Sequence, residues 1–425
     1  MEILEIIEKL NPWWSKKEFE SGIDRPLYLE KIKTYLGSKE IVILTGVRRA
    51  GKTTLLSQTI KFLIENKKVD PRQILFVNFD EADIATMNKP IKTVLDTYFQ
   101  EINSDKPAYL IFDEIQNIKG WERWAKSIYD EKQSRLIISG SFSHLLDNKL
   151  ATLISGRYLK VKVFPLDFNE FLDFNELELN NKLDIVSNKN RIIKCLKKYL
   201  IDGGFPRITL QQDNNLKREQ LKTYYESIVY KDILLMHEVR NSKLMKELIY
   251  YLMSNFTSSY SYKKLGNLLK LDFSTLKEYF SYLEESKILF ELSIFSYSLK
   301  VQSRNNKKIY CIDNGLRNAV SFQFSKDEGR LAENLVFIDL IRKDKEVYYW
   351  KDNNEVDFVT KNRDNSLTAI NVSYTNEIDE REVKGLLEFE GKFDKCKKMI
   401  LLTRDIEKIE KGVNFIPLWK WLLNK

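Results

Sequence analysis

A short aliphatic run followed by a glycine-rich stretch constrains this chain more than any other feature. Residues 41–44 read as a buried strand, and Gly-Val-Arg-Arg-Ala-Gly-Lys-Thr follows from Gly46 to Thr53. In such a loop the backbone N–H groups face nucleotide phosphates, Lys52 reaches the β- and γ-phosphates, and the Thr53 hydroxyl coordinates Mg²⁺. We therefore expect ATP and Mg²⁺ as ligands. The predicted nucleotide-binding residues are Gly46, Val47, Arg48, Arg49, Ala50, Gly51, Lys52, Thr53 and Thr54.

Two later apolar runs each end in a pair of acids, Asp80-Glu81 and Asp113-Glu114. A hydrolytic site of this kind needs one acid to hold Mg²⁺ and a second to orient and polarise the attacking water. We assign these roles to Asp113 and Glu114. Asp80-Glu81 is the competing pair and ranks lower, because Asn78 interrupts the apolar run before it, but it could line the same pocket.

Polar residues that follow a further apolar run complete the predicted catalytic set. Residues 135–138 are followed by Ser139-Gly-Ser141, and either serine is placed to sense the γ-phosphate or the water. Arg157 can neutralise charge on a phosphate in the transition state, in its own subunit or in a neighbouring one; a surface arginine is the alternative. The predicted catalytic residues are Lys52, Glu114, Ser139, Ser141 and Arg157.

These segments resemble the prokaryotic AAA-type P-loop ATPases of the AAA+ superfamily. The matching segments are Gly46-Val-Arg-Arg-Ala-Gly-Lys-Thr, Phe112-Asp-Glu-Ile-Gln116, Ser139-Gly-Ser, Gly156-Arg-Tyr and Pro165-Leu-x-Phe-x-Glu-Phe171. The doubled arginine Arg48-Arg49 is typical of a bacterial and archaeal group that carries a nuclease-like C-terminal domain. The resemblance implies the Mg²⁺ role for Asp113, the water-activating role for Glu114, and a trans-acting or sensor role for Arg157.

Composition limits the remaining alternatives. A chain of 425 residues predicts two to four domains, and a net charge of +8 permits a nucleic-acid partner without requiring one. Three isolated cysteines and two histidines argue against a zinc site or a disulfide framework. No apolar run approaches the about 18–20 residues of a membrane span, and the acidic start does not read as a signal peptide. We expect a cytoplasmic protein without a membrane partner.

The chain is predicted to be α/β and to have four parts. Residues 1–165 form the parallel-sheet ATPase core, and residues 166–240, with apolar residues at helical spacing, form a helical lid. Residues 241–303 predict a winged helix-turn-helix, since two amphipathic helices precede an alternating strand pattern. This part carries eight Lys/Arg against six Asp/Glu, so DNA binding and a protein-contact or structural role both stay open.

The last part, residues 304–425, is expected to hold a strand at 308–312 and an order of elements that resembles restriction-endonuclease-like domains. Glu333 and Asp357 match the first two metal-binding positions of that resemblance. The third position falls at Asn371-Val372-Ser373, where the acid and the lysine are both missing. We therefore expect a catalytically degenerate domain that binds DNA or a protein partner, or that stabilises the fold.

The favoured hypothesis is an ATPase that couples hydrolysis to a conformational change on DNA or a protein partner. The alternative is a nucleotide-gated binding module with slow turnover, and an ATP-regulated nuclease ranks third. The pair Asp113-Glu114 favours hydrolysis, because a switch that never hydrolyses ATP would not need Glu114. A trans-acting Arg157 would require a homo-oligomer.

Overall fold

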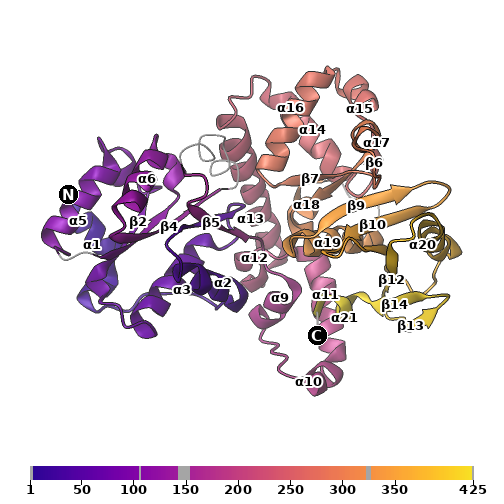
Figure 1. Ribbon diagram of the computed structural model, residues 1–425, viewed down its shortest axis with the longest axis horizontal. Helices are drawn as coiled ribbons and strands as arrows, with labels where there is room; N and C mark the ends of the chain where they lie inside the picture. Colours follow the sequence, from indigo (N-terminus) through magenta and orange to yellow (C-terminus); the bar gives the residue numbers. More distant parts are fainter. Residues whose placement is uncertain (1–2, 105–106, 142–153, 322–326, 424–425) are drawn as a thin grey trace. The chain divides into compact units, whose positions relative to one another are not determined.

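The computed structural model describes residues 3–104, 107–141, 154–321 and 327–423. The chain divides into two compact units, Met1–Val163 and Phe164–Lys425 (Figure 1). Within the described ranges, no helix has both the length and the apolar character needed to cross a bilayer.

The first unit is built on a five-stranded, fully parallel sheet, as the sequence predicts. Its strands are β1 (Ile41–Gly46), β2 (Ile74–Asn78), β3 (Ala108–Asp113), β4 (Ser134–Gly140) and β5 (Tyr158–Val163). They lie in the order β2-β3-β4-β1-β5. The carboxyl ends of β1, β3 and β4 therefore meet at one edge of the sheet, where α/β proteins bind their ligands.

Helices cover this sheet and bury its strands. Every residue of β1 is buried, which explains its continuous run of aliphatic side chains. The α-helices are α1 (Ile3–Leu10), α2 (Pro26–Leu36), α3 (Lys52–Glu65), α4 (Ala82–Ala85), α5 (Pro90–Glu101) and α6 (Trp121–Glu131), with 3₁₀ turns η1 (Pro12–Ser15), η2 (Pro71–Gln73) and η3 (Ile115–Asn117). The aliphatic core fixes the strand ends, and so fixes the residues that follow them.

The second unit begins with a helical segment, again as predicted. It holds α9 (Phe168–Phe174), α10 (Lys182–Ser187), α11 (Lys189–Asp202), α12 (Pro206–Leu210), α13 (Asn214–Ser227) and the π-helix η4 (Ile228–Leu235). Between α11 and α12, the Gly204 N–H donates to the Asp313 carboxylate at 2.7 Å. Gly203 has φ of +75°, and a Cβ there would collide with the same carboxylate. Since these helices belong to the second unit, their role as a lid stays a prediction.

A helical cluster with a small antiparallel sheet follows. It consists of α14 (Ser242–Ser254), β6 (Ser259–Tyr260), α15 (Tyr262–Leu269), α16 (Phe273–Glu285), β7 (Leu289–Leu292), α17 (Leu299–Arg304), β8 (Lys307–Cys311) and α18 (Asn314–Val320). The sheet order is β6-β8-β7. We expected the strand at 308–312 in the C-terminal part of the chain, but β8 pairs with β6 and β7 instead. Strand β8 is the next strand after β7 along the chain, and consecutive strands commonly pair with each other.

The rest of the second unit is a six-stranded mixed sheet with two long helices. Its elements are α19 (Glu328–Arg342), β9 (Glu346–Lys351), β10 (Glu355–Lys361), β11 (Leu367–Ser373), α20 (Glu380–Lys392), β12 (Cys396–Thr403), β13 (Lys408–Glu410), β14 (Val413–Pro417) and α21 (Leu418–Leu423). The strand order is β13-β14-β12-β11-β10-β9. Strands β9, β10 and β11 are antiparallel neighbours, whereas β11, β12 and β14 run parallel.

Candidate functional site

The loop from Gly46 to Lys52 connects β1 to α3 at the carboxyl edge of the first sheet. Gly51 has φ of +96° and Arg49 has φ of +68°, so the loop turns back on itself before the helix begins. A Cβ on Gly46 would lie 2.4 Å from the Val163 carbonyl oxygen of β5. Glycine is therefore required at Gly46 by close packing and at Gly51 by the positive φ.

Lys52 and Thr53 occupy the first turn of α3, whose N-terminus favours anions. The Lys52 side chain is only 4% exposed, and its ammonium donates to the carbonyl oxygens of Gly46 and Val47 at 3.1 and 3.5 Å. The lysine thus lies across the concave side of the loop. A phosphate bound there would meet the ammonium and the helix N-terminus together.

Arg25 supports this loop from outside, and the sequence reasoning missed it. The residue is 1% exposed, its Nη1 donates to the Ala50 carbonyl oxygen at 2.7 Å, and its guanidinium lies 4.5 Å from the centre of the Tyr28 ring. A buried arginine that bonds to the backbone fixes the outer side of the loop. A lone arginine before Pro26 carries no sequence signal for this role.

Asp113 ends β3 and receives hydrogen bonds from two hydroxyl groups. Thr53 Oγ1 donates to Asp113 Oδ2 at 2.6 Å, and Ser139 Oγ donates to Asp113 Oδ1. Asp113 is fully buried; burial and the neighbouring Glu114 raise the pKa of its carboxyl. The hydroxyl of Thr53 and the carboxylate of Asp113 are hard oxygen ligands of the kind that Mg²⁺ prefers, so these two residues fit the ion.

Glu114 lies beside the loop lysine. Its Oε1 is 3.7 Å from Lys52 Nζ, its Oε2 is 3.9 Å from Arg48 Nη1, and the Gln116 side-chain amide donates to it. The residue has φ of +51°, a conformation that costs a non-glycine residue on the order of 1 kcal/mol and often marks functional positions. The acid predicted to activate water is therefore brought to the phosphate-binding loop.

The two candidate serines differ in their contacts. Ser139 Oγ bonds to Asp113 and also accepts from the Glu114 N–H at 3.4 Å. The Ser141 hydroxyl is buried and has no hydrogen-bond partner among the described residues. The geometry therefore connects Ser139, rather than Ser141, to the two acids.

Arg157 lies away from this cluster. It precedes β5 at the amino edge of the sheet, where its carbonyl oxygen accepts from the Ile41 N–H at 2.8 Å. The six residues of β1 separate it from the loop by roughly 20 Å, so it does not reach the site of its own chain. Its guanidinium instead lies 3.8 Å from the Asp130 carboxylate.

The competing acids Asp80-Glu81 follow β2, which pairs with β3 and lies three positions from β1. The Phe79 N–H donates to the Asp113 carbonyl oxygen at 2.9 Å, so the pair lies beside the end of β3. Asp80 accepts from the Asn117 amide at 3.2 Å.

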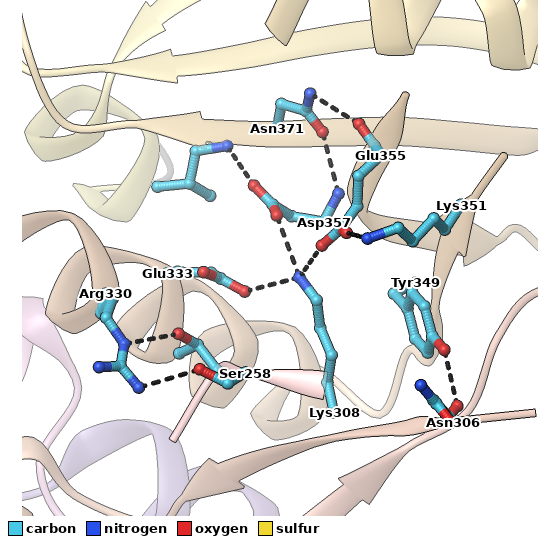
Figure 2. Close-up of polar contacts among 12 residues, drawn as sticks. Ser258, Asn306, Lys308, Arg330, Glu333, Tyr349, Lys351, Glu355, Asp357 and Asn371 are labelled. Atoms are coloured by element: carbon cyan, nitrogen blue, oxygen red, sulfur yellow. Dashed lines mark hydrogen bonds and ion pairs between the residues drawn. The ribbon is translucent and has the colours of Figure 1, made fainter. Parts of the chain in front are cut away.

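A second cluster of acids lies in the second unit, where a buried lysine fills it (Figure 2). Lys308 of β8 is 3% exposed, and its ammonium lies 3.1 Å from Glu333, 2.7 Å from Glu355 and 3.2 Å from Asp357. Burial lowers the pKa of this ammonium, but the charges of Glu333, Asp357 and Glu355 outweigh that effect and raise it well above its ordinary value. The two acids predicted from sequence are thus brought together around a cation of the protein itself.

The position of the missing third motif has a structural role. Asn371 Oδ1 accepts from the Asp357 N–H at 2.9 Å, and its Nδ2 donates to Glu382 at 3.2 Å. The Val372 N–H donates to Asp357 at 2.9 Å, so that carboxylate is held by the backbone as well as by Lys308. In the described part of the chain, no group of His, Cys, Asp and Glu is arranged to hold a metal ion. Sequence reasoning missed Lys308 because it lies far from the predicted motifs along the chain.

Three family models match the chain in succession: an AAA domain over residues 38–172, a domain of unknown function over 193–327 and another over 328–421. The uncharacterized protein MJ1544 of Methanocaldococcus jannaschii is 33% identical and covers 92% of this chain and 90% of its own length. An uncharacterized protein of Haemophilus influenzae is 28% identical and covers 94% of this chain and 98% of its own. A Walker-type ATPase of Pyrococcus abyssi with a solved structure is 15% identical, covers 70% of this chain and 95% of that protein, and has a TM-score of 0.43. The chain belongs to the family of AAA-type P-loop ATPases in which the AAA domain precedes two domains of unknown function.

Proposed function

We propose that this protein is a Mg²⁺-dependent ATPase that couples hydrolysis to a conformational change on DNA or a protein partner. The observation that carries the proposal is the Asp113 carboxylate, which accepts from Thr53 and Ser139 at the carboxyl edge of the sheet. Lys52 and Glu114 lie beside it, 3.7 Å apart. A protein that only binds nucleotide has no use for a second acid at this place.

Each residue has a distinct part in the proposed reaction. The loop N–H groups and Lys52 bind the β- and γ-phosphates and hold the γ-phosphate in place. Thr53 and Asp113 would hold Mg²⁺, which supplies positive charge against the phosphate oxygens. Glu114 orients a water molecule for attack and accepts its proton, and Ser139 fixes both acids through its hydroxyl.

Phosphate release by the purified protein tests the proposal. Glu114→Gln should bind ATP as the wild type does but release phosphate about 10²–10⁴-fold more slowly, because a positioned base contributes that much. Glu81→Gln is the matched control, since it changes the competing acid pair in the same unit, and it should keep wild-type turnover. Turnover that survives Glu114→Gln would contradict the assignment, as would turnover lost in Glu81→Gln.

The coupling to DNA or a partner is the less direct part of the proposal. The order α14, β6, α15, α16, β7, with β6 and β7 both antiparallel to β8, supports the predicted winged helix-turn-helix. The alternative, a nucleotide-gated binding module, predicts slow turnover that DNA does not change. Phosphate release with and without DNA distinguishes the two, because a coupled ATPase should respond to its target.

Arg157 enters this proposal only in trans. Its place at the amino edge of the sheet supports a contact with a neighbouring subunit rather than with its own nucleotide. A homo-oligomer is then part of the mechanism, and turnover per subunit should rise with protein concentration in the wild type but not in Arg157→Ala. The nuclease alternative has no support here, because the two acids that it needs, Glu333 and Asp357, are paired with Lys308.

A further inference from the structure

A basic hollow lies between α11, α13 and α18 in the second unit. It has a volume of about 760 Å³, and five cations and one acid line it: Lys194, Lys197, Lys198, Lys217, Arg218 and Asp202. The acid is already neutralised, because Asp202 pairs with Lys217 at 2.5 Å. The other four cations therefore have no acid in the lining of the hollow to balance their charge.

The three lysines of α11 lie on one face of the helix. Lys194, Lys197 and Lys198 are spaced so that their side chains project to the same side. All three are exposed, and none forms an ion pair with any acid that the structure describes. Close like charges repel one another, so a bound anion would relieve this repulsion as well as add its own attraction.

Some other exposed lysines of the same unit have acidic partners. Lys222 pairs with Glu219 and Lys384 pairs with Glu380, each at 2.8 Å. Lys189, at the start of α11, pairs with Asp405 at 2.9 Å. What distinguishes the α11 lysines is that they lack such partners and line a hollow together with Arg218.

The chemistry of the hollow fits a phosphodiester backbone. A concave surface with one sign of charge concentrates the potential and attracts a ligand with repeated negative charges. None of the residues that line it is aromatic, so base stacking is not provided. Recognition here would depend on phosphates and be independent of sequence.

A second hollow, beside α15 and α16, is less suited to this task. It is lined by four cations, Lys263, Lys277, Arg304 and Lys307, but also by Asp272 and Glu291. The Lys307 ammonium is already engaged, since it donates to Ser293 Oγ at 2.8 Å and to the Gln302 carbonyl oxygen at 2.6 Å. Its acids would repel a phosphate that approached the lysines.

We infer that the basic hollow between α11, α13 and α18 binds the phosphate backbone of a nucleic acid. The inference names the class of partner of the proposed ATPase and the surface that binds it. Only the link between this binding and ATP hydrolysis rests on the proposed function. Binding can be measured without nucleotide, and basal phosphate release without nucleic acid. The two proposals can therefore fail separately.

The test is fluorescence anisotropy of the full chain with two probes, a labelled oligothymidylate and a labelled mixed-sequence duplex, over a range of KCl concentrations. The triple variant K194E/K197E/K198E should lose at least about tenfold in affinity for the form that the wild type binds. The slope of log K against log[KCl] should fall in magnitude by about 2–3, since up to three phosphate contacts disappear. The probe that shows this loss identifies the strand form.

Two further triples make the result specific. K395E/K397E/K398E changes the same number of exposed lysines in the same unit and should bind as the wild type does. K263E/K264E/K277E changes the region of the second hollow and should keep most of the affinity. All variants should retain the wild-type melting temperature and basal phosphate release. The inference is overturned if the wild type binds neither probe, if the α11 triple binds like the 395–398 control, or if only the 263–277 triple loses binding.

Discussion

Lys308→Met removes the one cation in the described part of the structure that pairs with all of Glu333, Glu355 and Asp357. Lys351 pairs with Glu355 alone, at 3.0 Å. The ammonium lies within 2.7–3.2 Å of all three carboxylates. The side chains of Glu333 and Asp357 are only 14% and 16% exposed, so water cannot replace most of what the lysine provides. Removing one partner from a buried charge cluster costs about 3–5 kcal/mol, and this site should lie in that range.

Hydrogen exchange measured by mass spectrometry reports this loss locally. Peptides that cover β8 and β10 should exchange about two to four orders of magnitude faster in Lys308→Met, since about 1.4 kcal/mol corresponds to a factor of ten. Adding Glu333→Gln to the variant should recover part of the protection, because one uncompensated charge is removed. Lys384→Met is the control: its partner Glu380 lies one turn away on α20, the two side chains are 62% and 84% exposed, and the cost in stability should be small.

The reasoning fails if the peptides of β8 and β10 exchange equally slowly in Lys308→Met and in Lys384→Met. It also fails if the Glu333→Gln addition makes Lys308→Met worse. Either result would mean that the carboxylates are solvated or protonated without the lysine, and that the cluster is not held by charge.

Two more predictions concern the acids of each unit. Ser139→Ala should lower the rate of phosphate release roughly 10–100-fold at unchanged ATP affinity, because it removes a charge-assisted hydrogen bond to Asp113. Ser141→Ala should lower this rate less, and equal effects of the two variants would contradict the assignment of Ser139. Burial and the nearby Asp357 raise the pKa of Glu382 to about 7, so the folded state favours the neutral carboxyl. The contribution of this group to the free energy of unfolding is therefore complete below about pH 4.5 and is lost as the pH rises through 7. In urea unfolding, the free energy of unfolding of Glu382→Gln should rise relative to that of the wild type by up to about 3 kcal/mol between pH 5 and pH 8. A difference that does not change with pH would refute this.

The arrangement of the candidate nucleotide site could be predicted from sequence because its residues are tied to strand ends. Once residues 41–46 and 108–113 are recognised as parallel strands, Lys52 and Asp113 must lie at the same edge of the sheet. The loop pattern also predicts that a helix follows it; α3 begins at Lys52, two residues before the start at Thr54 that the sequence suggests. Neither step needs knowledge of the rest of the fold.

Arg25 and Lys308 could not be predicted in this way. Each is a single basic residue whose partners lie far away in sequence or belong to the backbone, as with the Ala50 carbonyl oxygen. No periodicity or spacing marks such a residue. The same limit explains the place of β8, because a lone alternating strand does not reveal which sheet it will join.

The charge balance at Lys308 also has a consequence for how such chains can be cut and recombined. Lys308 belongs to the segment 193–327, whereas Glu333, Glu355 and Asp357 belong to the segment 328–421. Exchange of the first segment with a relative that lacks the lysine would leave Glu333 and Asp357 without this counter-charge in a largely buried place, while Glu355 would keep Lys351. Exchange of the second segment with a relative that lacks the acids would leave a buried ammonium without carboxylates. The two segments are therefore expected to be inherited, truncated and transplanted as one piece.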